Sequence, residues 1–186
     1  MTNPVKKINM LDAVKLFFKN YFNFTGRASR SEYWWFVLAY FIMAILALCI
    51  DASLVWYYNT LSMFDGIDYS SPYDVYYSPM IATASIIGFT SLTSRRLQDM
   101  GRSGWWQVGL YLGQIPFFIF LTLIFTTGFN AGVVSLTVIV GLAYFGYAIL
   151  LLVWLILPPK EDENKWGRNP LLPDTGLNDR MSDQSL

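Results

Sequence analysis

The sequence predicts an all-α, polytopic membrane protein with four transmembrane helices, arranged as two helical hairpins, and an N-terminal amphipathic helix at the membrane interface. Hydrophobic residues make up 54% of the 186 residues and charged residues only 14%, whereas charged residues make up roughly a quarter of an ordinary soluble domain. A soluble fold with this composition would lack the polar residues to cover its surface. The placement of the basic residues then sets the number and direction of the crossings.

The first 30 residues form a predicted cytoplasmic segment that contains the amphipathic helix. Between residues 8 and 24, apolar residues recur at helical spacing and lysines fall on the opposite face. The apolar positions are Leu11, Val14, Phe18 and Tyr21 or Phe22, and the lysines are Lys15 and Lys19. Because the apolar face is rich in aromatic rings, we favour a helix in the membrane interface over one packed on the transmembrane domain, although one helix can do both.

The predicted transmembrane domain covers residues 31–158, with spans at about 33–54, 80–94, 105–127 and 133–157. A crossing needs about 20 predominantly apolar residues. No charged residue occurs between Phe36 and Ile50, and Pro158-Pro159 follows the last span. The second span is short and rich in serine and threonine, so that a re-entrant segment is the alternative at this position.

Two polar segments flank these spans. Residues 51–79 carry four aspartates and six tyrosines but no lysine or arginine, and Gly66, Pro72 and Pro79 interrupt any long helix. We expect an acidic loop on one side of the membrane. Residues 159–186 form a polar cytoplasmic tail that is expected to be partly disordered beyond Pro173.

All thirteen lysines and arginines lie before the first span, between the second and the third, or after the fourth. Four crossings put these three segments on one face of the membrane, and the positive-inside rule makes that face cytoplasmic. Both termini are therefore expected in the cytoplasm. If residues 80–94 did not cross, the basic turn would share a side with the acidic loop, and the segregation of charge would be lost.

The turn at residues 95–106 is the best candidate for a functional site, because it holds the clustered charge between the two ends of the chain. Its charged residues are Arg95, Arg96, Asp99 and Arg102, and from the first hairpin Arg27, Arg30 and Glu32 are expected to join them. One interpretation is a site for an anion or lipid headgroup, because arginine binds phosphate through two donors. The other is charge that orients the chain, with an arginine–aspartate pair that holds the turn.

We favour the second interpretation, because the positive-inside rule alone requires basic residues at this position. The carboxylates of Asp99 and Glu32 favour the first, because orientation needs no carboxylate whereas an ordered network does. Tryptophans follow both basic segments and are expected to anchor the chain at headgroup level. These tryptophans are Trp34, Trp35, Trp105 and Trp106. Gln114, near mid-depth in the third span, is expected to bond a neighbouring helix or, in a pore, to line the path.

Several kinds of chemistry have no candidate residues. The chain has no histidine, and its one cysteine, Cys49, lies in an apolar run. We therefore expect no cofactor, no metal site and no enzymatic activity. The acidic run Glu161-Asp162-Glu163 disfavours binding of nucleic acid. The centre of every span lacks aspartate, glutamate, lysine and arginine, which argues against proton-driven transport but leaves a passive pore open.

Three segments of the chain are distinctive. They are Gly-Arg-Ala-Ser-Arg-Ser-Glu-Tyr-Trp-Trp at 26–35, Arg-Arg-Leu-Gln-Asp-Met-Gly-Arg-Ser-Gly-Trp-Trp at 95–106 and Asn-Lys-Trp-Gly-Arg-Asn-Pro at 164–170. These segments resemble the DUF805 family of small bacterial inner-membrane proteins of unknown function. The resemblance covers roughly residues 10–172. It implies a multi-pass protein of the bacterial inner membrane and supplies no catalytic residues. Gln98 stands where the family often has histidine, and the loop at 51–79 looks long.

Three classes of function remain. The weakest is a membrane enzyme that acts on a lipid headgroup, because the chain has no histidine, no cysteine pair and no phosphate-loop motif. The other two fit better. The first is a membrane interaction or scaffolding protein, embedded in the lipid bilayer, whose cytoplasmic surface recruits anionic lipid headgroups or a membrane-protein partner, including a second copy in a homo-oligomer. The alternative is a small channel or transporter, with Gln114 and the serine- and threonine-rich second span along its path.

Overall fold

The computed structural model describes residues 8–67, 76–159 and 161–172, and it is almost entirely helical. In chain order the elements are α1 (Met10–Lys19), α2 (Arg30–Asp65), α3 (Tyr77–Asp99), the short 3₁₀ helix η1 (Gly104–Gln107), α4 (Val108–Thr127), α5 (Ala131–Ile156), β1 (Glu163–Asn164) and β2 (Gly167–Arg168). The two strands form one antiparallel hairpin. The predicted all-α class is therefore confirmed, apart from this small hairpin in the tail.

Three of the described helical segments are long and apolar enough to cross a membrane: Arg30–Phe64, Gly104–Thr126 and Ala131–Ile156. Helix α3 is not among them, because its serines, threonines and charged C-terminal end lower its hydropathy. Its 23 residues nevertheless make a rod of about 35 Å at ~1.5 Å per residue, the thickness of a hydrocarbon core. Three candidate spans are thus present where the sequence predicted four.

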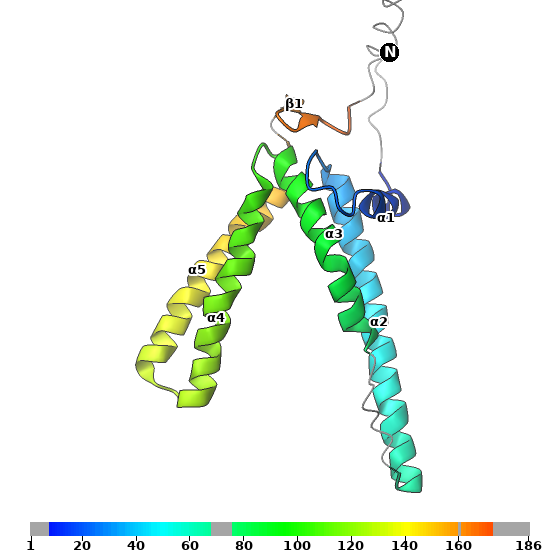
Figure 1. The fold of residues 1–186 in the computed structure, drawn as a ribbon, viewed down its shortest axis with the longest axis vertical. Coiled ribbons are helices and arrows are strands. Elements are labelled where there is room, and N and C mark those ends of the chain that lie inside the picture. The colour runs from blue at the N-terminus through cyan, green and yellow to red at the C-terminus, as the bar shows by residue number, and fades with distance from the viewer. Residues whose placement is uncertain (1–7, 68–75, 160, 173–186) are drawn as a thin grey trace, which may run out of the picture.

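The helices form two arms that diverge from a common end, which we call the apex (Figure 1). Helices α2 and α3 lie side by side in one arm, and α4 and α5 form the other. The hairpin of β1 and β2 lies beyond the apex, and α1 lies across the first arm close to it. Away from the apex, few contacts join the two arms.

The buried hydrophobic core lies near the apex and joins the N-terminal segment, both arms and the turn between them. Its members are Ile8, Ala13, Phe17, Ala28, Tyr33, Phe36, Leu92, Leu97, Leu151, Trp154 and Leu155. Most large apolar side chains farther along the arms are exposed, as expected for helix surfaces that face lipid rather than water.

Helix α2 is longer than the sequence predicted. Ser29 caps its start by accepting a hydrogen bond from the Glu32 N–H at 3.1 Å. The helix continues past the expected end near residue 54 and stops at Gly66, whose φ of 71° suits the left-handed end of a helix. The acidic loop expected at 51–79 was therefore wrong for residues 51–65, which contain no glycine or proline that would interrupt a helix. Residues 68–75 of that loop lie outside the described part of the chain.

Asp51 of α2 holds the start of α3. Its carboxylate accepts hydrogen bonds from the N–H groups of Tyr77 and Ser78 at 2.8 and 2.9 Å. Helix α3 has no side-chain cap of its own at Tyr76, so Asp51 takes that role from another helix. Helix α3 thus begins beside the middle of α2 and returns to the apex.

Small residues set the close packing of the second arm. A Cβ atom on Gly109 would overlap the ring of Tyr147, and one on Gly113 would press on Tyr144. The Tyr147 hydroxyl donates to the carbonyl of Trp106 at 2.5 Å. The two glycine contacts join α4 to α5 at the separation that the Gly-xxx-Gly spacing permits, and the Tyr147 bond joins η1 to α5.

Helix α1 and the turn after it pack on the first arm through Phe17, which the sequence did not single out, and through Val14 and Tyr21 of the predicted apolar face. The Phe17 ring stacks on Phe36 with 3.7 Å between centroids, and a Cβ atom on Gly88 of α3 would overlap Phe17. Leu11 and Phe18, from the predicted apolar face, are 68% and 66% exposed. The helix therefore packs on its own bundle and also presents apolar side chains outward.

A buried arginine–carboxylate network at the apex

The C-terminal end of α3 brings the charged turn into the interior of the protein. Gly101, with a φ of 73°, lets the chain reverse directly after the helix, and the Arg102 N–H bonds the Leu97 carbonyl at 3.0 Å. The Ala28 N–H donates to the Arg95 carbonyl at 3.2 Å, which fixes the segment before α2 against this turn. The segment that leads into α2 and the C-terminal end of α3 thus meet at the apex.

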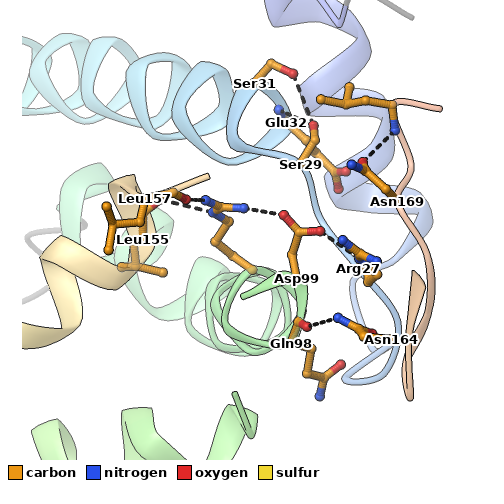
Figure 2. A network of polar contacts seen from close by, with 12 residues as sticks. Arg27, Ser29, Ser31, Glu32, Gln98, Asp99, Leu155, Leu157, Asn164 and Asn169 are labelled. Atoms are coloured by element: carbon orange, nitrogen blue, oxygen red, sulfur yellow. Dashed lines mark hydrogen bonds and ion pairs between the residues drawn. The ribbon is translucent and has the colours of Figure 1, made fainter. Parts of the chain in front are cut away.

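Asp99 lies at the centre of five charged residues that we call the apex network: Arg27, Glu32, Arg95, Arg96 and Asp99. One Asp99 carboxylate oxygen accepts from Arg27 Nε at 2.7 Å, and the other accepts from Arg96 Nη1. All three side chains are at most 1% exposed. Figure 2 shows Asp99 between the two guanidinium groups. A single carboxylate therefore compensates two buried cations.

The other donors of Arg27 hold the C-terminal tail. Its Nη1 donates to the carbonyls of Asp162 and Gly167 at 3.2 and 3.0 Å, and its Nη2 donates to the Glu161 carbonyl at 3.0 Å. The tail is also held by Asn164, whose side chain donates to the Gln98 carbonyl at 2.9 Å. The hairpin in the tail is thus docked on the turn between the arms.

Arg96 joins the turn to the end of the second arm. Its Nε donates to the Leu155 carbonyl at 3.0 Å, and its Nη2 donates to the carbonyl of Leu157 (Figure 2). Helix α5 ends at Ile156, so these carbonyls lack partners within the helix and carry the negative end of its dipole. Burial lowers the pKa of the Arg96 guanidinium and Asp99 opposes this shift, and an arginine remains charged at neutral pH.

Arg95 and Glu32 form the second ion pair of the apex network. Arg95 Nη1 donates to Glu32 Oε1 at 2.9 Å, with both side chains at most 5% exposed. The Nε and Nη2 atoms of Arg95 are buried without a hydrogen-bond partner. Three guanidinium groups therefore face two carboxylates, which leaves one positive charge in excess within a buried cluster.

The remaining predicted residues lie outside the network. Arg30 is exposed and takes part in none of the ion pairs found among the described residues. Arg102 is half-buried, with its guanidinium carbon 3.6 Å from the centroid of the Trp154 ring. The Trp106 ring packs edge-on against Trp154 at 5.3 Å. Arg102 therefore binds an aromatic ring of the second arm, not a carboxylate.

The other predicted tryptophans and Gln114 lie apart from the charged cluster. Trp105 is 80% exposed, Trp35 is exposed and Trp34 is half-buried. Gln114 Nε2 donates to the hydroxyl of Tyr144 at 3.2 Å, from α4 to α5. Gln114 thus forms an interhelical hydrogen bond, which is one of the two roles expected of it.

Sequence reasoning missed the partners that are backbone atoms. The carbonyls of Leu155, Leu157, Glu161, Asp162 and Gly167 accept most of the bonds of Arg27 and Arg96, and no side-chain pattern marks them. A signal for the tail did exist, because the Asn164–Pro170 segment is one of the three on which the family resemblance rests.

Arg27 and Arg96 have no donor nitrogen left for a ligand, and the unused donors of the network, Nε and Nη2 of Arg95, are buried. The Nε, Nη1 and Nη2 atoms of Arg27 and Arg96 all donate to carboxylate or carbonyl oxygens. An anion that binds these arginines would therefore have to displace one of the internal partners. A polar cleft of about 230 Å³ opens beside it, lined by Asp99, Met100, Gly101, Arg102, Glu161 and Asn164. The described residues contain no cluster of three or more potential metal ligands from histidine, cysteine, aspartate and glutamate.

A family model described as "Protein of unknown function (DUF805)" matches residues 21–168, which include the whole apex network. The chain belongs to the DUF805 family. This DUF805 protein is 32% identical over 110 residues to the inner membrane protein YhaI of Escherichia coli K12, covering 59% of the chain and 80% of YhaI. It is 33% identical over 106 residues to YhaH of the same organism, covering 57% of the chain and 75% of YhaH. No solved structure matches it.

The match confirms the resemblance seen in the sequence. Together with the three long apolar helical segments, it identifies a membrane protein of a family without an assigned activity. Because the family has no assigned activity, the geometry of the apex is the observation that bears on the function of this chain.

Proposed function

We propose that this DUF805 protein is a non-enzymatic interaction and scaffolding protein of the bacterial inner membrane. The apex network would hold two helical hairpins and the tail in one fixed cytoplasmic surface, and that surface would recruit anionic lipid headgroups or a membrane-protein partner. The observation that carries this proposal is the use of Arg27 and Arg96, whose donors join four separate segments of the chain through Asp99 and backbone carbonyls.

The path of the chain supports four crossings. Helix α2 leaves the apex and α4 starts again at the apex, so a segment has to return between them, and α3 does so alongside α2. Helix α1 and the tail hairpin also lie at the apex, which carries the basic residues. By the positive-inside rule this end is cytoplasmic, with both termini. The inner-membrane names of YhaI and YhaH support the same location.

The cations outside the network are the candidates for contact with lipid headgroups. Arg30, Lys15 and Lys19 are exposed, and the two lysines lie on α1, which also exposes Leu11 and Phe18. A helix with exposed apolar side chains and lysines suits the boundary between acyl chains and headgroups. Attraction to an anionic surface contributes about 1 kcal/mol per basic residue.

Among the residues that the structure describes, no contact favours the channel or transporter. The polar groups assigned to a path are used in packing: Gln114 bonds Tyr144, and the hydroxyls of Thr83 and Ser85 donate to carbonyls of their own helix at 2.7 Å. These bonds leave the scaffolding role as the better supported proposal.

The decisive experiment is purification of the full chain in mild detergent, followed by mass spectrometry of the lipids and proteins that remain bound. We expect anionic lipids to be enriched over zwitterionic ones, and the combined change Lys15→Gln, Lys19→Gln and Arg30→Gln to abolish the enrichment. The matched control, Lys15→Arg, Lys19→Arg and Arg30→Lys, keeps every charge and should keep the lipids. Equal lipid content in all three proteins, with no partner protein retained, would overturn the proposal.

A further inference from the structure

A second pocket lies beside the turn, and its lining is uncharged. It has a volume of about 420 Å³ and lies between the segment before α2, the C-terminal half of α3, the start of the second arm and the tail. The residues that matter here are Thr90, Ser94, Gln98, Trp105, Gln107 and Trp166. None of the described residues that line it is ionisable. In Figure 2 the Gln98 side chain points away from Asp99, so this pocket is separate from the apex network.

Two buried amides at this pocket have an unused acceptor. Gln98 Nε2 donates to the Phe24 carbonyl at 2.9 Å and to Ser94 Oγ at 3.2 Å, and Gln107 Nε2 donates to the Thr90 carbonyl at 3.1 Å. The Oε1 atoms of both amides are buried without a partner.

The orientation of both amides is fixed. Rotating either amide by half a turn would place its oxygen against a carbonyl oxygen, so the unpartnered atoms are acceptors and not donors. Only 6% of Gln98 and 5% of Gln107 is exposed, and both side chains line the pocket. A ligand in the pocket that carries N–H or O–H groups would therefore supply the donors that these oxygens lack once the amides turn toward it.

The aromatic residues narrow the chemistry of that ligand. Trp105 is 80% exposed, so its ring is available for stacking. The Lys165 ammonium already lies 4.3 Å from the centroid of the Trp166 ring and would repel a second cation. An anion finds no basic side chain in the lining. Amide oxygens, hydroxyl groups and an aromatic face together suit a neutral compound with several hydroxyl groups.

We propose that this pocket binds a neutral polyol, a glycerol or sugar unit, whose hydroxyls donate to the Oε1 atoms of Gln98 and Gln107 while its carbon skeleton lies against Trp105. The volume falls within the range of about 300–1,000 Å³ that small-molecule sites occupy. The polyol can be a free solute or the glycerol end of a lipid headgroup, since both present the same hydroxyl groups. This site is independent of the lysines and arginine in the proposed lipid contact.

The test uses the full chain in lauryldimethylamine oxide, a detergent without a sugar headgroup. Binding of glycerol and of maltose is titrated by saturation-transfer NMR. Short-chain phosphatidylglycerol is compared with short-chain phosphatidic acid, which carries the phosphate without the terminal glycerol. Saturable binding of a free polyol, or binding of phosphatidylglycerol at least fivefold tighter than phosphatidic acid, supports the site and identifies the source.

Two variants and one control decide whether the binding occurs at this pocket. Gln107→Met removes an unpartnered oxygen at nearly constant shape, and Trp105→Ala removes an exposed ring whose loss does not threaten folding. Each should weaken binding about tenfold, whereas Gln114→Met, which changes an amide bonded to Tyr144 in the second arm, should leave it unchanged. The proposal is overturned if the wild type binds none of the polyols, or if the variants at positions 105 and 107 bind as tightly as the wild type.

Discussion

Asp99 compensates two guanidinium groups with one carboxylate, and this makes it the residue on which the apex depends most. Each of its oxygens bonds a different arginine, one from the segment before α2 and one from the end of α3. A buried ion pair contributes little when compared with a well-packed apolar replacement, but removal of one partner leaves a buried charge uncompensated.

Asp99→Asn should therefore destabilise the protein by about 3–5 kcal/mol, because it keeps the shape of the side chain and leaves Arg27 and Arg96 without their anion. Unfolding in detergent, followed by tryptophan fluorescence during titration with a denaturing detergent, measures this change. Arg30→Gln is the control, and we expect its effect to stay within about 0.5 kcal/mol because Arg30 is exposed. Equal stability of Asp99→Asn and the wild type would contradict a structural role for the network.

Arg27→Lys should release the tail while it keeps the charge. Lysine has one nitrogen and cannot reproduce the fork that bonds Asp99 and the carbonyls of Glu161 and Gly167 together. Hydrogen exchange at residues 163–168 should become faster in this variant, and Arg30→Lys should leave it unchanged. Unaltered exchange in the tail would show that other contacts, such as that of Asn164, hold the hairpin.

For single residues, the sequence indicated which side chains belong to the apex network better than it indicated which atoms they contact. A carboxylate among arginines exceeds what orientation in the membrane requires, and this argument selected Asp99 and Glu32. It could not separate Arg27, which enters the network, from Arg30, three residues later, which faces outward. The Ser29-x-x-Glu32 spacing marks where α2 starts. It does not show how that start packs against α3, and this packing decides the side on which each arginine lies.

Among the elements, the start of α3 depends on a residue from another helix. Asp51→Ala should fray this start by removing both acceptors for Tyr77 and Ser78, at a cost of about 0.5–2 kcal/mol. Hydrogen exchange of these two amides should increase. Ser53→Ala serves as the control, because its hydroxyl bonds only the carbonyl of Cys49 within α2. Protection that survives in Asp51→Ala would mean that packing alone orders the first turn of α3.

Packing between α4 and α5 gives a matched pair of glycine changes. Gly109→Ala should lower stability by about 1–3 kcal/mol, because its new methyl group would overlap the Tyr147 ring. Gly146→Ala lies in open space and should be neutral or stabilising by up to about 1 kcal/mol through helix propensity. Thermal unfolding of both variants in the same detergent compares them directly, and equal melting temperatures would contradict the close contact.

The elements were predictable where length and hydropathy agree, as for α4 and α5, whose bounds lie close to the expected spans. They were less predictable in α2, because Tyr57, Tyr58 and Asp65 beyond residue 54 resemble a loop in composition, although no glycine or proline interrupts the helix before Gly66. The β1–β2 hairpin depends on docking against Arg27, and two-residue strands have no periodicity to detect.

For the whole molecule, the proposed topology predicts which compartment each end of the arms reaches. A reporter fused after Asp68 should lie in the periplasm, and one fused after Leu186 should lie in the cytoplasm, because α2 and α3 together cross and return. A pair of reporters active in opposite compartments, such as alkaline phosphatase and green fluorescent protein, measures this. Both fusions in one compartment would remove the crossing assigned to α3.

The two hairpins followed from the distribution of charge, but their divergence did not. Charge fixes which ends lie on the same face of the membrane and carries no information about the separation of the opposite ends. That separation depends on the contacts between the two arms, and in the described residues these contacts lie near the apex.

Because the described parts of the two arms are joined at the apex only, each arm can act as a lever that pivots there. A helix of 36 residues extends about 54 Å at ~1.5 Å per residue. A small rotation of the arms at the apex, where Arg96 bonds the end of α5, therefore becomes a much larger displacement at their far tips. Lipid or protein that binds between the tips acts on the contacts at the apex with the same leverage.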